Sequence, residues 1–203
     1  MAQTIETKVT GAVYQEKFAE LAKQPAWLTP LRKAGIESFA AQGFPTLQHE
    51  DWRFTNIAAI TKMPFQPAHE TTTNGAETQA LSTAVFTALS GSRLVFVDGF
   101  FSAKLSSIKP PAGGVKIKNL ADALTSESAL IEKHLGKYAV TKDNAFAALN
   151  QAFFADGAFI YVPAGVTVEE PVQLIYLSSA QQSGAAIHPR NLIIASYTAI
   201  KRK

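Results

Sequence analysis

The side chains best suited to metal chemistry in this sequence are its four histidines and their acidic neighbours. His49, Glu50 and Asp51 stand in a row, and each type of side chain can ligate a metal ion. Adjacent residues on a strand or helix point in different directions, so such a row rarely converges on one ion. No His-Glu-x-x-His pattern or similarly spaced pair occurs. We therefore expect no metal site. The remaining histidines carry no metal-ligand spacing either, and we expect His188, before Pro189 at a turn, to face solvent; they are His69, His134 and His188.

The sequence holds no recognisable catalytic arrangement. Its carboxylates are not placed by any pattern at the separation that acid–base catalysis needs; those weighed are Asp143, Asp156, Glu169 and Glu170. Gly113-Gly114 lacks the lysine and hydroxyl residue of a phosphate loop, and no nucleophile elbow or dinucleotide fingerprint occurs. The count of 0 cysteines excludes disulfides, a catalytic cysteine and thiolate ligation of an iron–sulfur cluster by this chain. We expect no enzymatic activity, no catalytic residue and no bound cofactor.

Trp52, Arg53 and Phe54 allow two interpretations. Tryptophan and arginine are enriched at interface hot spots, which would make the segment a docking site. Large aromatics more often gain stability by burial, so they would anchor an irregular segment to the core while Arg53 pairs with Glu50 or Asp51. The second interpretation is favoured. Asp156-Gly157, Asn150 and the turn Pro163-Ala164-Gly165 are likewise expected to serve the backbone rather than a ligand.

Helices are predicted in the N-terminal part of the chain. Tyr14, Phe18 and Leu21 recur at helical spacing. A second helix is predicted to begin with Thr29 as N-cap and Pro30 in the first helical position. Gly43 then supplies a left-handed C-terminal cap, and Phe44-Pro45 ends the helix.

The middle of the chain alternates between turns, one strand and helices. We interpret 46–61 as irregular and 63–75 as a loop or linker. Residues 94–97 form an apolar run before the turn at Asp98-Gly99, which predicts a strand. Residues 119–135 are predicted to be helical. Asp143 is predicted to cap a further helix that Asp156-Gly157 terminates and that carries Phe146, Leu149 and Phe153.

Three short β-rich runs follow, at residues 159–162, 173–177 and 191–195. Turn signals separate them and no helical pattern intervenes. They fit either rungs of a parallel β-solenoid or strands of a sandwich, and periodicity alone does not choose.

The charge pattern argues against nucleic acid as a partner. The basic residues Lys201, Arg202 and Lys203 account for the whole excess of 19 basic over 16 acidic residues, so no basic face is expected on the folded part. No apolar stretch approaches the roughly 20 residues that cross a bilayer, and the N-terminus has no signal-peptide pattern. We expect a cytoplasmic protein that binds neither membrane nor nucleic acid.

The order and spacing of several motifs resemble the SufB/SufD family of iron–sulfur cluster assembly. Residues 146–153 (FAALNQAF), 156–166 (DGAFIYVPAGV) and 171–174 (PVQL) carry most of the resemblance. Residues 188–193 (HPRNLI) are similar to the family's next rung. Upstream, 43–45 (GFP), 50–55 (EDWRFT) and 97–100 (VDGF) are similar to the N-terminal region of the SufD branch.

The resemblance implies an α+β fold, with a helical N-terminal domain followed by the first rungs of a right-handed parallel β-helix. The expected regions are a helical N-terminal region (1–62), a linker with a short helix (63–90), a mixed α/β connecting region (91–157) and an incomplete start of the β-helix core (158–203). It also implies a scaffold role beside a SufB-like protein and a SufC-like ATPase, whose complex handles the iron–sulfur cluster.

The chain stops about halfway along a usual family member, so we expect a truncated, non-functional form lacking most of the partner interface. Residues 199–203 do not continue the rung pattern. Two other functions stay open. One is a carbohydrate-binding or carbohydrate-active β-helix or sandwich protein. The other is a regulatory fragment that competes with a full-length relative for its partners.

Overall fold

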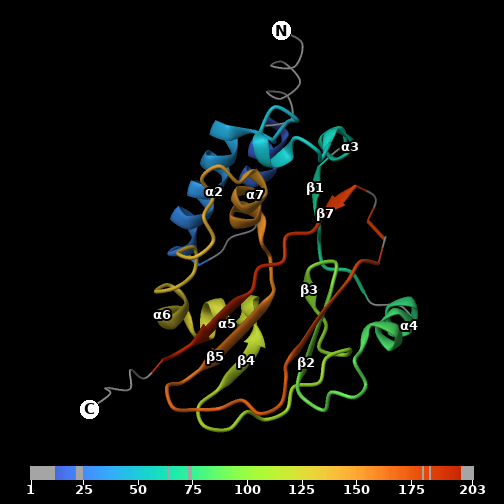
Figure 1. The fold of residues 1–203 in the computed structure, drawn as a ribbon, viewed down its shortest axis with the longest axis vertical. Coiled ribbons are helices and arrows are strands. Elements are labelled where there is room, and N and C mark those ends of the chain that lie inside the picture. The colour runs from blue at the N-terminus through green and yellow to red at the C-terminus, as the bar shows by residue number, and fades with distance from the viewer. Residues whose placement is uncertain are drawn as a thin grey trace. The chain divides into compact units, whose positions relative to one another are not determined.

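The structure, a computed structural model, describes residues 12–21, 25–63, 65–72, 75–179, 181–182 and 184–197 (Figure 1). The Lys201–Lys203 tripeptide and residues 199–203, on which two predictions fall, lie outside this part. The chain forms two compact units that are interleaved along the sequence. Unit 1 comprises Met1–Ala68, His134–Phe154 and Gln182–His188; unit 2 comprises His69–Lys133, Ala155–Gln181 and Pro189–Lys203.

Unit 1 is built mainly from helices. Residues 12–19 are helical, and the later elements are α2 (Leu28–Gln42), the 3-10 helix η1 (Glu50–Trp52), α3 (Ala58–Thr61) and α7 (Ala145–Phe153). The strands β1 (Gln66–Pro67) and β7 (Ala185–Ala186) pair in parallel. The two longer helices, α2 and α7, pack against each other (Figure 1).

The core of unit 1 is aromatic. Tyr14 stacks on Phe65 with ring centroids 3.9 Å apart, and Phe39 meets Phe44 edge to face at 5.0 Å. Aromatic pairs in such geometries add stability beyond the burial of their area. Tyr14, expected on an amphipathic helix, is 6% exposed, and its burial raises its pKa to about 12.

The sequence correctly predicted the C-terminal end of α2 but not its N-terminal end. Gly43 closes the helix as expected, with φ 66° and its N–H donating to the Phe39 carbonyl at 2.8 Å. The prediction of Thr29 as N-cap is wrong. The helix begins at Leu28 after Trp27, which makes no side-chain capping bond, and Pro30 lies inside the first turn. Leu28 is fully buried, so the first residue of the helix already packs into the interior. Proline is tolerated anywhere in a first turn because those N–H groups have no helical acceptor.

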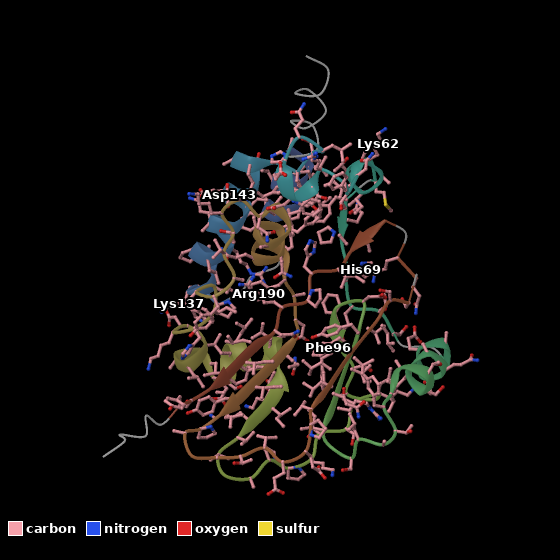
Figure 2. All side chains as sticks on the ribbon, viewed as in Figure 1. Lys62, His69, Phe96, Lys137, Asp143 and Arg190 are labelled. Atoms are coloured by element: carbon pink, nitrogen blue, oxygen red, sulfur yellow. The ribbon has the colours of Figure 1, made fainter. Side chains whose placement is uncertain are left out.

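The cap of α7 also differs from the prediction by one residue. The side chain of Asn144 accepts the Ala147 N–H at 2.9 Å, which is the capping bond. Asp143 instead occupies the turn before the helix, at φ 57°, and is exposed (Figure 2). The helix ends at Phe153, ahead of Asp156-Gly157. Its buried face carries Leu149 and Phe153, as the spacing predicts.

Unit 2 contains two three-stranded sheets. One has the order β3-β2-β6, from Phe100–Phe101, Arg93–Val97 and Gln173–Leu177. The other has the order β4-β5-β8, from Lys116–Asn119, Ala158–Val162 and Leu192–Ala195. Its helices are α4 (Gly75–Ala84), α5 (Leu120–Ser126) and α6 (Ser128–Ile131). One helix was expected over 119–135, but Glu127, at φ −128° and ψ 24°, separates α5 from α6.

The sheets and helices of unit 2 pack through their apolar faces. Leu94 and Phe96 of β2 share one cluster with Ala158 of β5 and Ile117 of β4, so this cluster joins the two sheets (Figure 2 labels Phe96). Val95 and Val97, on the opposite face of β2, pack with Leu81 of α4. In the second sheet, helix α5 packs against β4 and β5. Alternate residues of one strand therefore serve two clusters.

The predicted rungs of a parallel β-helix are wrong, although the α+β class is right. The three β-rich runs do not coil on one another in succession. β6 pairs in parallel with β2, which comes from far upstream, and β8 pairs in parallel with β5. Each sheet also has an antiparallel member, β3 against β2 and β4 against β5. The described residues of unit 2 thus form two small mixed sheets, because upstream strands occupy edges that a solenoid would give to the next rung.

Candidate partner-binding surface on the Trp52 segment

The segment from Thr46 to Met63, here called the Trp52 segment, is held by successive local turns. The Trp52 N–H donates to the His49 carbonyl at 2.9 Å, and the Thr55 N–H donates to the Trp52 carbonyl at 2.9 Å. His49 Nδ1 accepts the Thr46 N–H at 3.0 Å. His49 therefore serves the turn.

Trp52 fastens this segment to unit 1. The side chain is half-buried, and its ring centroid lies 5.4 Å from that of Phe146 on α7. Phe44 contacts the same phenylalanine, with centroids 5.7 Å apart. The prediction that Trp52 anchors an irregular segment is confirmed. The reason is that α7 presents a large ring that the flat indole can cover.

Phe54 is not an anchor, which corrects the prediction for this aromatic. It is 90% exposed, and the Arg53 guanidinium carbon lies 5.2 Å from its ring centroid. Arg53 also pairs with Glu50 as expected, at 3.6 Å between Nη1 and Oε1. Both of these charged side chains are largely exposed, so their ion pair adds little stability.

Further large apolar side chains of the Trp52 segment are open to solvent. They are Leu47 at 50%, Ile60 at 51% and Met63 at 56% exposed. Single exposed apolar residues are ordinary, whereas several on one short segment that also carries an exposed aromatic make that segment a candidate interaction site. Trp52 thus holds the segment on unit 1, while other apolar side chains of the segment stay exposed to solvent. This combination suits binding of another protein.

His188 does not face solvent, contrary to the prediction. Its ring is half-buried, with its centroid 5.6 Å from that of Phe153 and 6.0 Å from that of Phe65. Burial lowers the pKa of this imidazole to about 4, against the opposing effect of a backbone hydrogen bond with Ala186. The chain returns to the aromatic core of unit 1 through β7, and sequence periodicity gives no sign of that return.

Asp156 and Gly157 serve the backbone, as expected, but not by ending a helix. The Asp156 carboxylate is 4% exposed and accepts the N–H groups of Ala121 and Gly157 at 2.8 Å and of Phe101 at 3.1 Å. The Asn119 amide donates to it as well, at 3.1 Å. Gly157, at φ +156°, passes so close to Arg190 that a Cβ would lie 2.0 Å from the Arg190 carbonyl oxygen.

Two further buried charges hold the backbone; Arg32 was not singled out from the sequence, and Asp98 was expected only as a turn residue. Arg32 on α2 donates to the carbonyls of Ala152 and Phe154, where α7 ends, and its guanidinium lies 4.2 Å from the Phe154 ring centroid. Burial lowers its pKa to about 10. Asp98, at φ 49°, accepts the N–H and hydroxyl of Ser179. A lone charged residue in an apolar helix face was the available signal for Arg32.

The remaining candidates are dispersed. Glu170 pairs with Lys109 at 2.7 Å, and His134 Nδ1 lies 2.5 Å from the Tyr138 hydroxyl oxygen. In the part of the chain that the structure describes, no three His, Asp or Glu side chains gather closely enough to hold a metal ion. Over the same residues no helix combines the length and apolar character required to cross a bilayer.

Comparison with known proteins identifies the family. A sequence model for the SufBD protein N-terminal region matches residues 6–174. The iron–sulfur cluster assembly protein SufD of Bacillus subtilis is 29% identical over 195 residues, which cover 91% of this chain and 43% of that protein. An iron–sulfur cluster assembly SufBD family protein of Synechocystis is 22% identical over 168 residues, or 83% of this chain and 36% of the relative.

SufB of Bacillus subtilis is similar over a shorter stretch, with 39% identity over 83 residues that cover 41% of this chain and 17% of SufB. The chain spans less than half the length of these curated relatives. Because the family model covers most of the sequence, this chain belongs to the SufBD family and corresponds to its N-terminal region.

Proposed function

We propose that this chain acts as a SufD-type scaffold in iron–sulfur cluster assembly and contributes protein contacts rather than a catalytic centre. The similarity to Bacillus subtilis SufD extends over 91% of the chain, against 41% for SufB, which supports the SufD branch. The cluster is then cargo of the assembly. A chain with 0 cysteines offers no thiolate to ligate it. Membership of the SufBD family also argues against the alternative of a carbohydrate-binding or carbohydrate-active protein.

The Trp52 segment is the surface that we propose for the partner contacts of this scaffold role. A partner that covers Phe54, which is 90% exposed, removes apolar area from water, and the half-buried Trp52 keeps the segment in place beforehand. Because Trp52 packs on Phe146, the backbone of the segment loses little conformational entropy on binding. We propose a SufB-like or SufC-like protein as the partner.

Co-expression tests this proposal directly. The tagged chain is produced with the SufB-like and SufC-like proteins of the same organism, and the recovered partners are quantified after affinity purification. We expect recovery of at least one partner, and weaker recovery with Phe54→Ala. The matched control is Phe86→Ala in unit 2, where a phenylalanine is 71% exposed outside the Trp52 segment.

Two results would contradict the proposal. Failure of the unaltered chain to retain either partner removes the scaffold role. Equal loss of partner with Phe54→Ala and Phe86→Ala leaves the role but removes the Trp52 segment as its site.

A further inference from the structure

Unit 2 has an open hollow of ≈ 370 Å³ beside β4 and β5, lined by both polar and apolar side chains. Its lining comes from β4, β5 and the junction of α5 with α6, and consists of Lys116, Ser126, Glu127, Ser128, Ala129, Leu130 and Tyr161. Small-molecule sites occupy roughly 300–1,000 Å³, so this volume suits a small ligand.

Strand pairing brings the polar groups of the hollow together. Lys116 lines the hollow. Lys118 lies outside the lining but is two residues further along β4, on the same face of the sheet, and its ammonium reaches the lining residues Ser126 and Glu127. Tyr161 of β5 is the antiparallel partner of Lys116, which places the phenol on that face too. Ile117, between the lysines, belongs to the apolar cluster on the opposite face.

The break between α5 and α6 adds a carboxylate and two hydroxyls. Glu127 accepts from Lys116 Nζ at 2.5 Å and from Lys118 Nζ at 3.2 Å. Lys118 also donates to Ser126 Oγ at 3.1 Å. The Glu127 side chain is 13% exposed, and the lysines are 38% and 34% exposed.

The charges of this cluster do not cancel. The ammonium groups of Lys116 and Lys118 face the single carboxylate of Glu127. Their hydrogen bonds, above all the one from Lys116, lower the pKa of Glu127, so this carboxylate stays ionised. One positive charge remains. Each ammonium has three N–H donors, so Glu127 and Ser126 leave donors on both lysines for a further acceptor.

We propose that this hollow binds the phosphate group of a small molecule through Lys116 and Lys118. The surplus positive charge selects an anion, and lysine is a common point-charge ligand for phosphate. A tetrahedral oxyanion can accept from several directions at once, which matches ammonium groups flanked by the hydroxyl residues Ser126, Ser128 and Tyr161. The site is independent of the scaffold role proposed above.

Nuclear magnetic resonance of the ¹⁵N-labelled full chain provides the test. Inorganic phosphate is titrated at pH 7.5 while sodium chloride holds the ionic strength constant. We expect saturable shifts at the amides of residues 116–118, 126–128 and 161, with no saturable change near Lys109. A second titration uses glycerol 3-phosphate, a phosphate monoester. Tighter binding of the monoester at the same amides assigns the ligand to a phosphorylated metabolite, and equal affinity assigns it to free phosphate.

Three variants separate the site from general electrostatics. Lys116→Gln combined with Lys118→Gln should weaken binding at least about tenfold. Glu127→Gln removes the competing negative charge and should tighten binding roughly three- to tenfold, a gain that misfolding cannot produce. Lys109→Gln is the control, because Lys109 pairs with Glu170 at 2.7 Å in a one-to-one ion pair.

Several results would overturn the proposal. They are shifts that rise linearly with phosphate concentration, a Glu127→Gln variant that binds no more tightly than the unaltered chain, and equal weakening by Lys109→Gln and the double variant.

Discussion

Replacing Asp156 by asparagine removes the acceptor for two of the hydrogen bonds that connect three segments of unit 2. Oδ1 accepts from the N–H groups of Ala121 and Gly157, and Oδ2 accepts from the Phe101 N–H and the Asn119 amide. An asparagine keeps one oxygen and turns an NH₂ group toward the donors of the other. Two donors, each buried or partly buried, then lose their acceptor.

The expected cost follows from those two donors. A hydrogen bond to a charged group contributes about 1.5–3 kcal/mol, so Asp156→Asn should lower the free energy of unfolding of unit 2 by about 3–6 kcal/mol. The matched control is Asp122→Asn, an exposed acid in the first turn of α5. Its interaction with the helix dipole is worth below about 1 kcal/mol.

Hydrogen exchange read by mass spectrometry is the suitable assay. Both tryptophans, Trp27 and Trp52, belong to unit 1, so fluorescence reports mainly on that unit. We expect peptides from β2 and β4 to exchange at least about a hundredfold faster in Asp156→Asn than in the unaltered chain. Exchange no faster than in Asp122→Asn would refute the assignment of Asp156 as the residue that joins these segments.

Two further predictions concern unit 1, and tryptophan fluorescence during urea unfolding measures both. His188 has a pKa lowered from 6.5 to about 4 in the folded state, so its contribution is complete above pH 6.5 and is lost as the pH falls toward 4, by roughly 3 kcal/mol. His188→Gln should flatten that part of the stability curve, and an unchanged curve would contradict the burial of this ring. Arg32→Lys should cost about 2 kcal/mol, because one ammonium cannot reach both the Ala152 and Phe154 carbonyls while facing a ring. Lys33→Gln, at a side chain 66% exposed, is its control, and an equal cost would show that the guanidinium is not required.

Local signals predicted the elements of this fold better than its pairings. The face of α7 was evident from Phe146, Leu149 and Phe153, and Gly43 marked the end of α2, since both depend on residues within a few turns. The strand at 94–97 was found for the same reason, as an apolar run before Asp98-Gly99.

The sheets were mispredicted because their partners are remote. Nothing in residues 173–177 indicates that β2 rather than the preceding run lies beside them, since an apolar strand fits either neighbour. The same remoteness concealed the burial of His188 and the exposure of Phe54. In the proposed phosphate site the spacing of Lys116 and Lys118 could be read from the sequence, but the position of Glu127 depends on a break between two helices that the sequence pattern did not indicate.

The interleaving of the units along the chain has a consequence for biosynthesis. Unit 1 includes Gln182–His188, and unit 2 includes Ala155–Gln181 and a segment after Pro189. Neither unit has all its strands until the ribosome has passed those stretches. Strand β1 therefore lacks its partner until β7 has been made, and β5 lacks its parallel neighbour until β8 has been made. The aromatic core of unit 1, by contrast, has all its rings once Phe153 has been made, so its packing can precede the pairing of the sheets.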